Sequence, residues 1–163
     1  MSMKAFSMPR LLIAFLAAVV VATVWGAVVQ TQFNLVALTG IGTDISAGVN
    51  LRTTMRDIFS GFTPTYGGYV VLPALLVAFL VAKFVVDRWS GSWWLWFGLA
   101  GALGVGLAIP LVNYLSPVAL LVGATRDTLC TVLMALGGGV AGLVFVWLLQ
   151  PARRPLGYPA ATA

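Results

Sequence analysis

The sequence contains no histidine and no glutamate, and it has a single cysteine, Cys130. Imidazole is the usual general base of enzymes and a frequent ligand of zinc, copper and haem iron, so its absence excludes those sites and the Ser-His-Asp triad. One cysteine cannot form an internal disulfide or a Cys-x-x-Cys redox pair. These absences exclude the commonest metal centres and the thiol oxidoreductases.

Charged residues are also scarce, at 8% of the 163 residues, which is about a third of the share in soluble domains. The four acidic residues are Asp44, Asp57, Asp87 and Asp127. No two of them lie within one helical turn, so a paired-carboxylate site would need distant parts of the chain to converge. No catalytic or nucleotide motif is present either. We therefore expect a protein that is not an enzyme, with no cofactor and no metal site.

Apolar residues, in contrast, make up 61% of the chain, and the mean hydropathy is +1.03. They form four long runs, at about residues 11–29, 69–86, 93–115 and 128–149. A helix needs about 20 apolar residues to cross a bilayer, and each run is near that length. The sequence predicts an all-α integral membrane protein, a single membrane domain in which four transmembrane helices form a bundle.

The formal charge of +5 would suggest nucleic acid in a soluble protein. Here the basic residues flank the apolar runs, where they mark topology and contact lipid phosphates, so we expect no nucleic-acid partner. Six basic residues fall on the side of the termini: Lys4, Arg10, Lys83, Arg88, Arg153 and Arg154. Three fall on the other side: Arg52, Arg56 and Arg126. The bias predicts cytoplasmic termini, with a cytoplasmic tail over 150–163, and small size and arginine-rich flanks favour a bacterial inner membrane.

Small residues recur every fourth position within three of the apolar runs, which places them on one stripe of a helix. They are Ala14, Ala18, Ala22 and Gly26, then Gly98, Ala102 and Gly106, and finally Gly138 and Gly142. In lipid, helices associate through close backbone approach, so such stripes predict packing faces. Trp25, near the end of the first run, is typical of an interfacial anchor.

The longest stretch without an apolar run covers residues 30–68, which we expect to form a structured extracytoplasmic loop. Its composition predicts short strands at Phe33–Leu38 and Ile45–Leu51, followed by a short amphipathic helix over 53–60 that starts at a capping threonine. Three apolar side chains of this helix should face inward: Met55, Ile58 and Phe59.

Polar and aromatic side chains in and near this loop are the candidate binding residues. They are Gln30, Gln32, Asn34, Arg52, Arg56, Asp57, Tyr66 and Arg126. The arginines could grip a phosphate or a carboxylate. The alternatives are structural, because the arginines could pair with nearby aspartates and the amides could join the first span to the loop.

These features favour a non-enzymatic membrane protein that acts by association, as an accessory subunit of a complex or a self-assembling unit, through its small-residue faces and outer loop. We expect membrane lipids and a protein partner or a homo-oligomer as its partners. No charged residue lies in the middle third of any span, which counts against a transport path within one bundle. One alternative is therefore an oligomeric channel or transport component with a path between protomers. Another is a lipid-binding or lipid-modifying protein.

Overall fold

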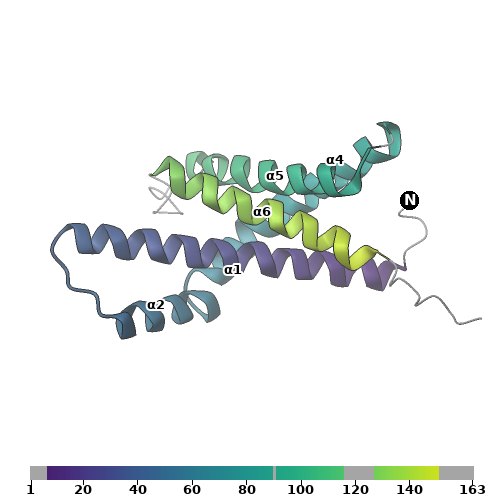
Figure 1. Ribbon diagram of the computed structural model, residues 1–163. Helices are drawn as coiled ribbons and strands as arrows, with labels where there is room; N and C mark the ends of the chain where they lie inside the picture. The colour runs from purple at the N-terminus through teal and green to yellow at the C-terminus, as the bar shows by residue number, and fades with distance from the viewer. Residues whose placement is uncertain (1–6, 90, 116–126, 151–163) are drawn as a thin grey trace, which may run out of the picture.

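The computed structural model describes residues 7–89, 91–115 and 127–150, and within them all regular structure is helical. The elements are α1 (Met8–Gly40), α2 (Ala47–Phe59), α3 (Thr63–Thr65), the π-helix η2 (Tyr66–Val71), α4 (Leu72–Trp89), α5 (Trp93–Leu115) and α6 (Thr128–Leu149) (Figure 1). Four stretches, which contain α1, α4, α5 and α6, are long and apolar enough to cross a membrane. The predicted all-α class is confirmed.

The predicted strands are wrong, because both segments are helical within the described residues. The first helix continues through Phe33–Leu38 and ends only at Gly40. Its buried residues there, Thr31 and Leu35, are four apart, which is helical spacing rather than the alternation of a strand. Most of Ile45–Leu51 belongs to α2, whose cap Ser46 accepts a hydrogen bond from the Val49 amide.

The short helix after these segments begins six residues earlier than predicted. Of the three side chains expected inside, Ile58 is half-buried. Met55 and Phe59 were expected inside, but they are 44% and 79% exposed. Thr54 is buried instead. The polar side of α2 meets α1 because hydrogen-bonding side chains on the end of α1 face it, as described below.

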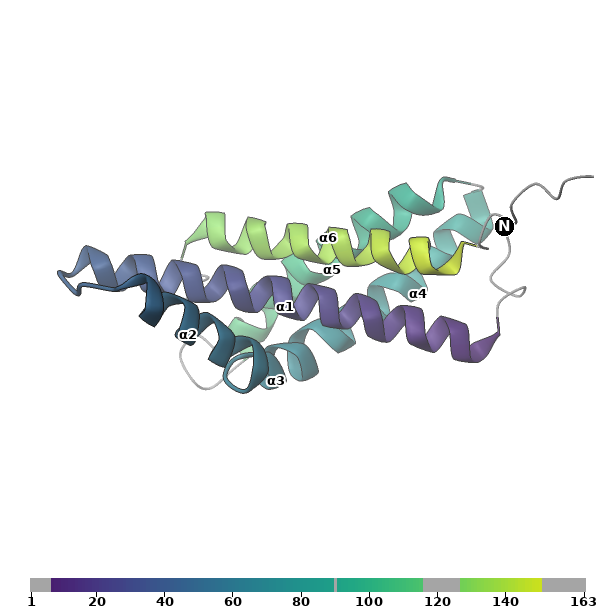
Figure 2. The same ribbon diagram turned by 60° about the horizontal axis from the view of Figure 1, so that its bottom comes forward.

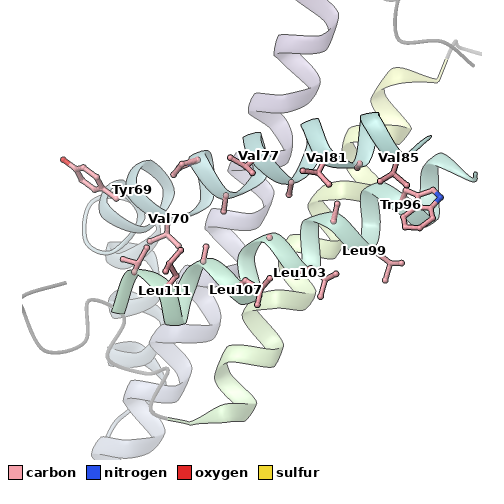
Figure 3. A pocket seen from close by; sticks show the side chains of 18 residues that line it. Tyr69, Val70, Val77, Val81, Val85, Trp96, Leu99, Leu103, Leu107 and Leu111 are labelled. Carbon is pink, nitrogen blue, oxygen red and sulfur yellow. The ribbon is translucent and has the colours of Figure 1, made fainter. Parts of the chain in front are cut away.

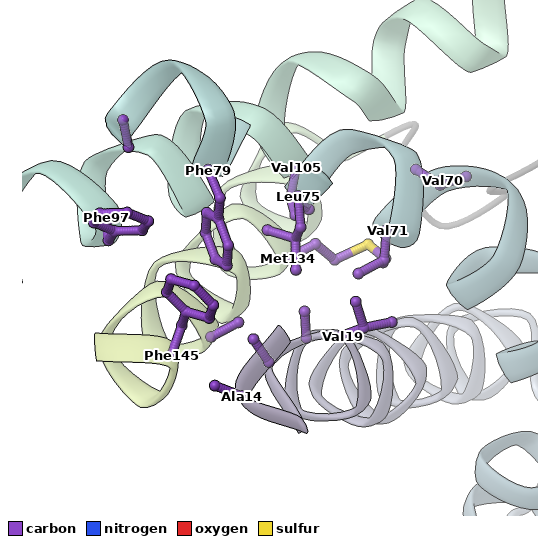
Figure 4. Close-up of a cluster of buried hydrophobic side chains, with 14 of the residues drawn as sticks. Ala14, Val19, Val70, Val71, Leu75, Phe79, Phe97, Val105, Met134 and Phe145 are labelled. Carbon is purple, nitrogen blue, oxygen red and sulfur yellow. The ribbon is translucent and has the colours of Figure 1, made fainter. Parts of the chain in front are cut away.

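The bundle is built around α6, which packs against α1 on one side and α5 on the other, while α4 packs on α5. Figure 4 shows the centre of the core, where Phe79, Phe97 and Phe145 meet from α4, α5 and α6. Their ring centroids are 4.8 to 5.4 Å apart, distances at which aromatic pairs attract beyond simple burial. These rings join α4, α5 and α6, and Ala14, Ala18 and Val19 bring α1 into the same core.

Glycines set the distance between α5 and α6. A Cβ atom on Gly101 would overlap the backbone carbonyl of Gly138, and one on Gly138 would overlap the carbonyl of Gly101. A Cβ on Gly142 would likewise collide with the Phe97 carbonyl. The two backbones touch here, as small-residue interfaces in lipid permit. The spacing of Gly138 and Gly142 pointed to this face, whereas Gly101 was missed.

The remaining small-residue stripes also lie against helices of the same chain. Ala14, Ala18 and Ala22 are buried in the bundle core. Gly26 lies under the ring of Tyr66. On α5, the stripe faces α6 through three pairs: Gly98 with Leu143, Ala102 with Gly139, and Gly106 with Ala135. These stripes thus pack against helices of the same chain.

Both ends of the described chain meet at one end of the bundle, which we call the termini end (Figure 1). Arg10 near the start of α1 donates hydrogen bonds to the Leu148 carbonyl, at 3.1 and 3.2 Å, and to the Gln150 carbonyl at 2.6 Å. The turn between α4 and α5 lies at the same end, and α2 lies toward the opposite end, which we call the α2 end (Figure 2). Three of the predicted cytoplasmic basic residues and most of the tail lie outside the described residues: Lys4, Arg153 and Arg154.

Candidate functional site

The polar side chains of the α2 end gather where α2 packs against the last turns of α1. Thr31 Oγ1 donates to Asp57 Oδ2 at 2.7 Å. Gln32 Nε2 donates to Asn50 Oδ1 at 3.1 Å and to Thr54 Oγ1 at 3.0 Å, while Asn50 Nδ2 donates back to Gln32 Oε1 at 3.2 Å. These hydrogen bonds engage the polar side chains of α2 and hold this helix against α1.

The predicted binding residues divide into three groups in the structure. Gln32 and Asp57 belong to the network that joins the two helices. Gln30 and Tyr66 are buried, and the exposed members are Asn34, Arg52 and Arg56. Arg126 lies outside the described residues. The seven described residues thus lie in three different surroundings.

Among residues 7–89, 91–115 and 127–150, the ion pair present is Lys83 with Asp87, at the termini end. The aspartates proposed as arginine partners have other roles. Asp57 accepts from Thr31, and Asp127 caps α6 by accepting from the Leu129 amide at 2.8 Å. In the described part of the chain, Arg52 and Arg56 thus have no carboxylate partner.

Tyr66 occupies a buried position between η2 and α1. It is 1% exposed, its ring lies against Gly26, and it stacks on Phe62 with centroids 4.8 Å apart. Its hydroxyl has no hydrogen-bond partner among the described residues, and the same holds for Gln30 Oε1 and Thr63 Oγ1. Gln30 lies one turn after Gly26, so the three unpaired atoms come from neighbouring turns of α1 and the α3–η2 segment.

The π-helix itself has a local cause in the sequence. Pro73 lacks an amide hydrogen and its ring would clash with the carbonyl four residues earlier, so the ordinary helical bond cannot form there. The Leu72 amide bonds to the Gly67 carbonyl, five residues back, which widens the turn. Gly67 in turn lies against the Thr23 side chain. The pair of glycines before Pro73 is the sequence signal for this distortion.

A groove of about 620 Å³ runs between α4 and α5 on the surface of the bundle (Figure 3). Its floor consists of small residues: Ala74, Ala78, Ala100, Gly104 and Ala108. Larger apolar side chains such as Val77, Val81, Leu103 and Leu107 form its walls, and Tyr69 and Trp96 stand toward its two ends. We call this the α4–α5 groove. Small residues recur at positions 74, 78 and 82 of α4, and this pattern could have predicted the groove.

The chemistry available in the described residues is that of binding surfaces. They contain no group of three or more histidine, cysteine, aspartate or glutamate side chains that could hold a metal ion. Cys130 is buried. The α4–α5 groove is lined almost entirely by apolar atoms, and the outer side of α2 carries two arginines. Comparison with known protein families, curated proteins and solved structures gives no match for this chain.

Proposed function

We propose that this is a non-enzymatic integral membrane protein that acts by association, and that the α4–α5 groove receives a transmembrane helix of a partner. The partner is a second copy of the chain or another subunit. The observation that carries the proposal is the groove itself, an apolar hollow at the surface whose small floor residues stay half-buried although Gly104 and Ala78 lie against each other.

The spacing of interfacial side chains supports a membrane location. Tyr69 on η2 and Trp89 on α4 are 20 residues apart, and so are Trp94 and Tyr114 on α5. Tyr69, Trp89 and Tyr114 are largely exposed. At 1.5 Å per residue each pair spans about 30 Å, which matches the hydrocarbon thickness of a bilayer. Aromatic residues concentrate at both membrane interfaces, so a bilayer fits between these two levels.

The groove suits a helix better than a polar solute. Its walls offer no hydrogen-bonding groups apart from the side chains near its ends, so a solute would lose its water without compensation. A helix in lipid needs no such compensation, because its backbone groups are already paired. Its gain comes from close van der Waals contact, which the alanines and Gly104 on the floor permit.

The test is to fill the groove and measure assembly. Ala100→Leu and Ala108→Leu each place a larger side chain on the floor, whereas Val132→Leu on the exposed side of α6 is the matched control. Native mass spectrometry of protein extracted gently from its own membrane should show a complex for the wild type and for Val132→Leu. Both groove variants should shift to the single-chain mass while eluting as folded protein.

A complex of two or more identical chains identifies self-assembly, and a heteromeric mass identifies an accessory subunit. A wild-type protein that is always a single chain contradicts the proposal. So do groove variants that keep the whole complex.

A further inference from the structure

The outer side of α2 combines an apolar strip with positive charge. Leu51, Met55 and Phe59 lie four residues apart, along one side of the helix, and they are 61%, 44% and 79% exposed. Because the polar face of α2 is bonded to α1, this strip is directed away from the bundle. Exposed apolar side chains in such a row mark a contact surface.

Two arginines border this strip. Arg52 and Arg56 are exposed and are one helical turn apart, so their side chains lie on the same side of α2. The carboxylate of α2, Asp57, faces α1 and accepts from Thr31. The outer side of α2 therefore presents two positive charges with no acidic group on the same helix face, which suits an anionic partner.

The position of α2 along the bundle places this surface at a membrane boundary. Arg10 marks the termini end of α1, and Thr31, which bonds to α2, lies 21 residues further along. That separation is about 32 Å of helix, close to the thickness of the hydrocarbon region. Figures 1 and 2 show α2 alongside the second half of α1, outside the four long helices. At that level of a bilayer, the neighbouring groups are the lipid phosphates and the part of the acyl chains next to the headgroups.

We propose that the outer side of α2 binds anionic phospholipids, with Arg52 and Arg56 on the headgroup phosphates and the apolar strip inserted at the start of the acyl chains. Arginine binds phosphate through paired N–H donors. A helix with one apolar side bordered by basic residues binds at the membrane interface by both effects together. This inference rests on α2 alone and is independent of the α4–α5 groove.

The experiment counts lipids retained by the purified full-length protein in native mass spectrometry, after titration with phosphatidylglycerol or phosphatidylcholine. Arg52→Gln and Arg56→Gln should each weaken the apparent affinity for phosphatidylglycerol by about fivefold, because a basic residue near an anionic surface contributes about 1 kcal/mol. Affinity for phosphatidylcholine should change little. Arg88→Gln at the termini end is the matched control and should retain its phosphatidylglycerol, since α2 is intact.

A third variant, Phe59→Ser, tests the apolar strip and should lower retention of both lipids. The proposal fails if the α2 arginine variants retain phosphatidylglycerol as well as Arg88→Gln does. It also fails if millimolar inorganic phosphate displaces the lipid completely, because the site would then recognise the free anion rather than the membrane surface. Unchanged retention in Phe59→Ser would overturn the insertion of the strip.

Discussion

At the scale of single residues, Trp25 illustrates how one side chain joins two helices. Its Nε1 donates to the backbone carbonyl of Leu133 at 2.8 Å, and its ring lies against Gly137. An interfacial tryptophan was expected here, but the indole crosses to α6 because Gly137 leaves room for it. One of the three consecutive glycines of α6 therefore has a packing partner on α1.

Trp25→Phe should lower the free energy of unfolding by about 0.5–1.5 kcal/mol, the usual contribution of one hydrogen bond. The ring contact with Gly137 stays in this variant, so the loss isolates the N–H group. Trp147→Phe, at an exposed position of α6, should leave stability nearly unchanged. Denaturant titration in detergent compares the two, and equal stability of both variants would refute the role of the bond.

At Gly101, the addition of a single methyl group should lower the free energy of unfolding strongly. In Gly101→Ala the new methyl group meets the Gly138 backbone, which cannot rotate away, so α5 and α6 must separate. We expect a loss of about 1–3 kcal/mol, as for overpacked cores. Gly68→Ala adds the same atom in open space and serves as control. The thermal unfolding midpoint in detergent should fall for Gly101→Ala alone.

At the scale of elements, the packing of α2 on α1 depends on a small number of polar contacts. Asp57→Ala removes the bond to Thr31 and should let α2 open from α1 more often. Trypsin cleaves after arginine, and cleavage requires an opened backbone, so cutting at Arg52 and Arg56 should become faster. Asp44→Ala, in the exposed turn before α2, is the matched control. Equal cleavage rates would show that Asp57 does not hold the helix.

The elements also show what the sequence could and could not predict. The apolar runs were long, so the sequence predicted the four long helices correctly. The strands expected at Phe33–Leu38 and Ile45–Leu51 were wrong because a few alternating apolar residues fit a strand and a helix equally well. The helix prevails there because Gln32 and Thr31 find partners on α2, a contact between distant segments that no local pattern reveals.

The surroundings of the predicted site residues depend on contacts of the same kind. Residue type singled out Gln30, Tyr66 and the arginines, but burial and pairing decide what each can do, and both depend on neighbours from other helices. The small-residue stripes were visible because their period is local. That they face helices of the same chain, while the floor of the α4–α5 groove stays open, follows only from the assembled bundle.

At the scale of the whole molecule, the two ends of the described chain lie at one end of the bundle, which makes membrane orientation testable. The basic residues at the termini end predict that this end faces the cytoplasm. A fluorescent protein fused after Ala163 should therefore be bright in a bacterial host, and alkaline phosphatase fused there should be inactive. A phosphatase inserted after Asp44 should be active. The reverse pattern in both positions would place the termini outside.

The hydrogen bonds between Arg10 and the end of α6 have a consequence for the order in which the chain folds. These bonds join residues 138 and 140 positions apart, so they cannot form until α6 has left the ribosome. Before that, α1 can already pack against α2 and the α3–η2 segment. The contact of α1 with α6 is thus the last that α1 makes, which places closure of the bundle after the synthesis of α6.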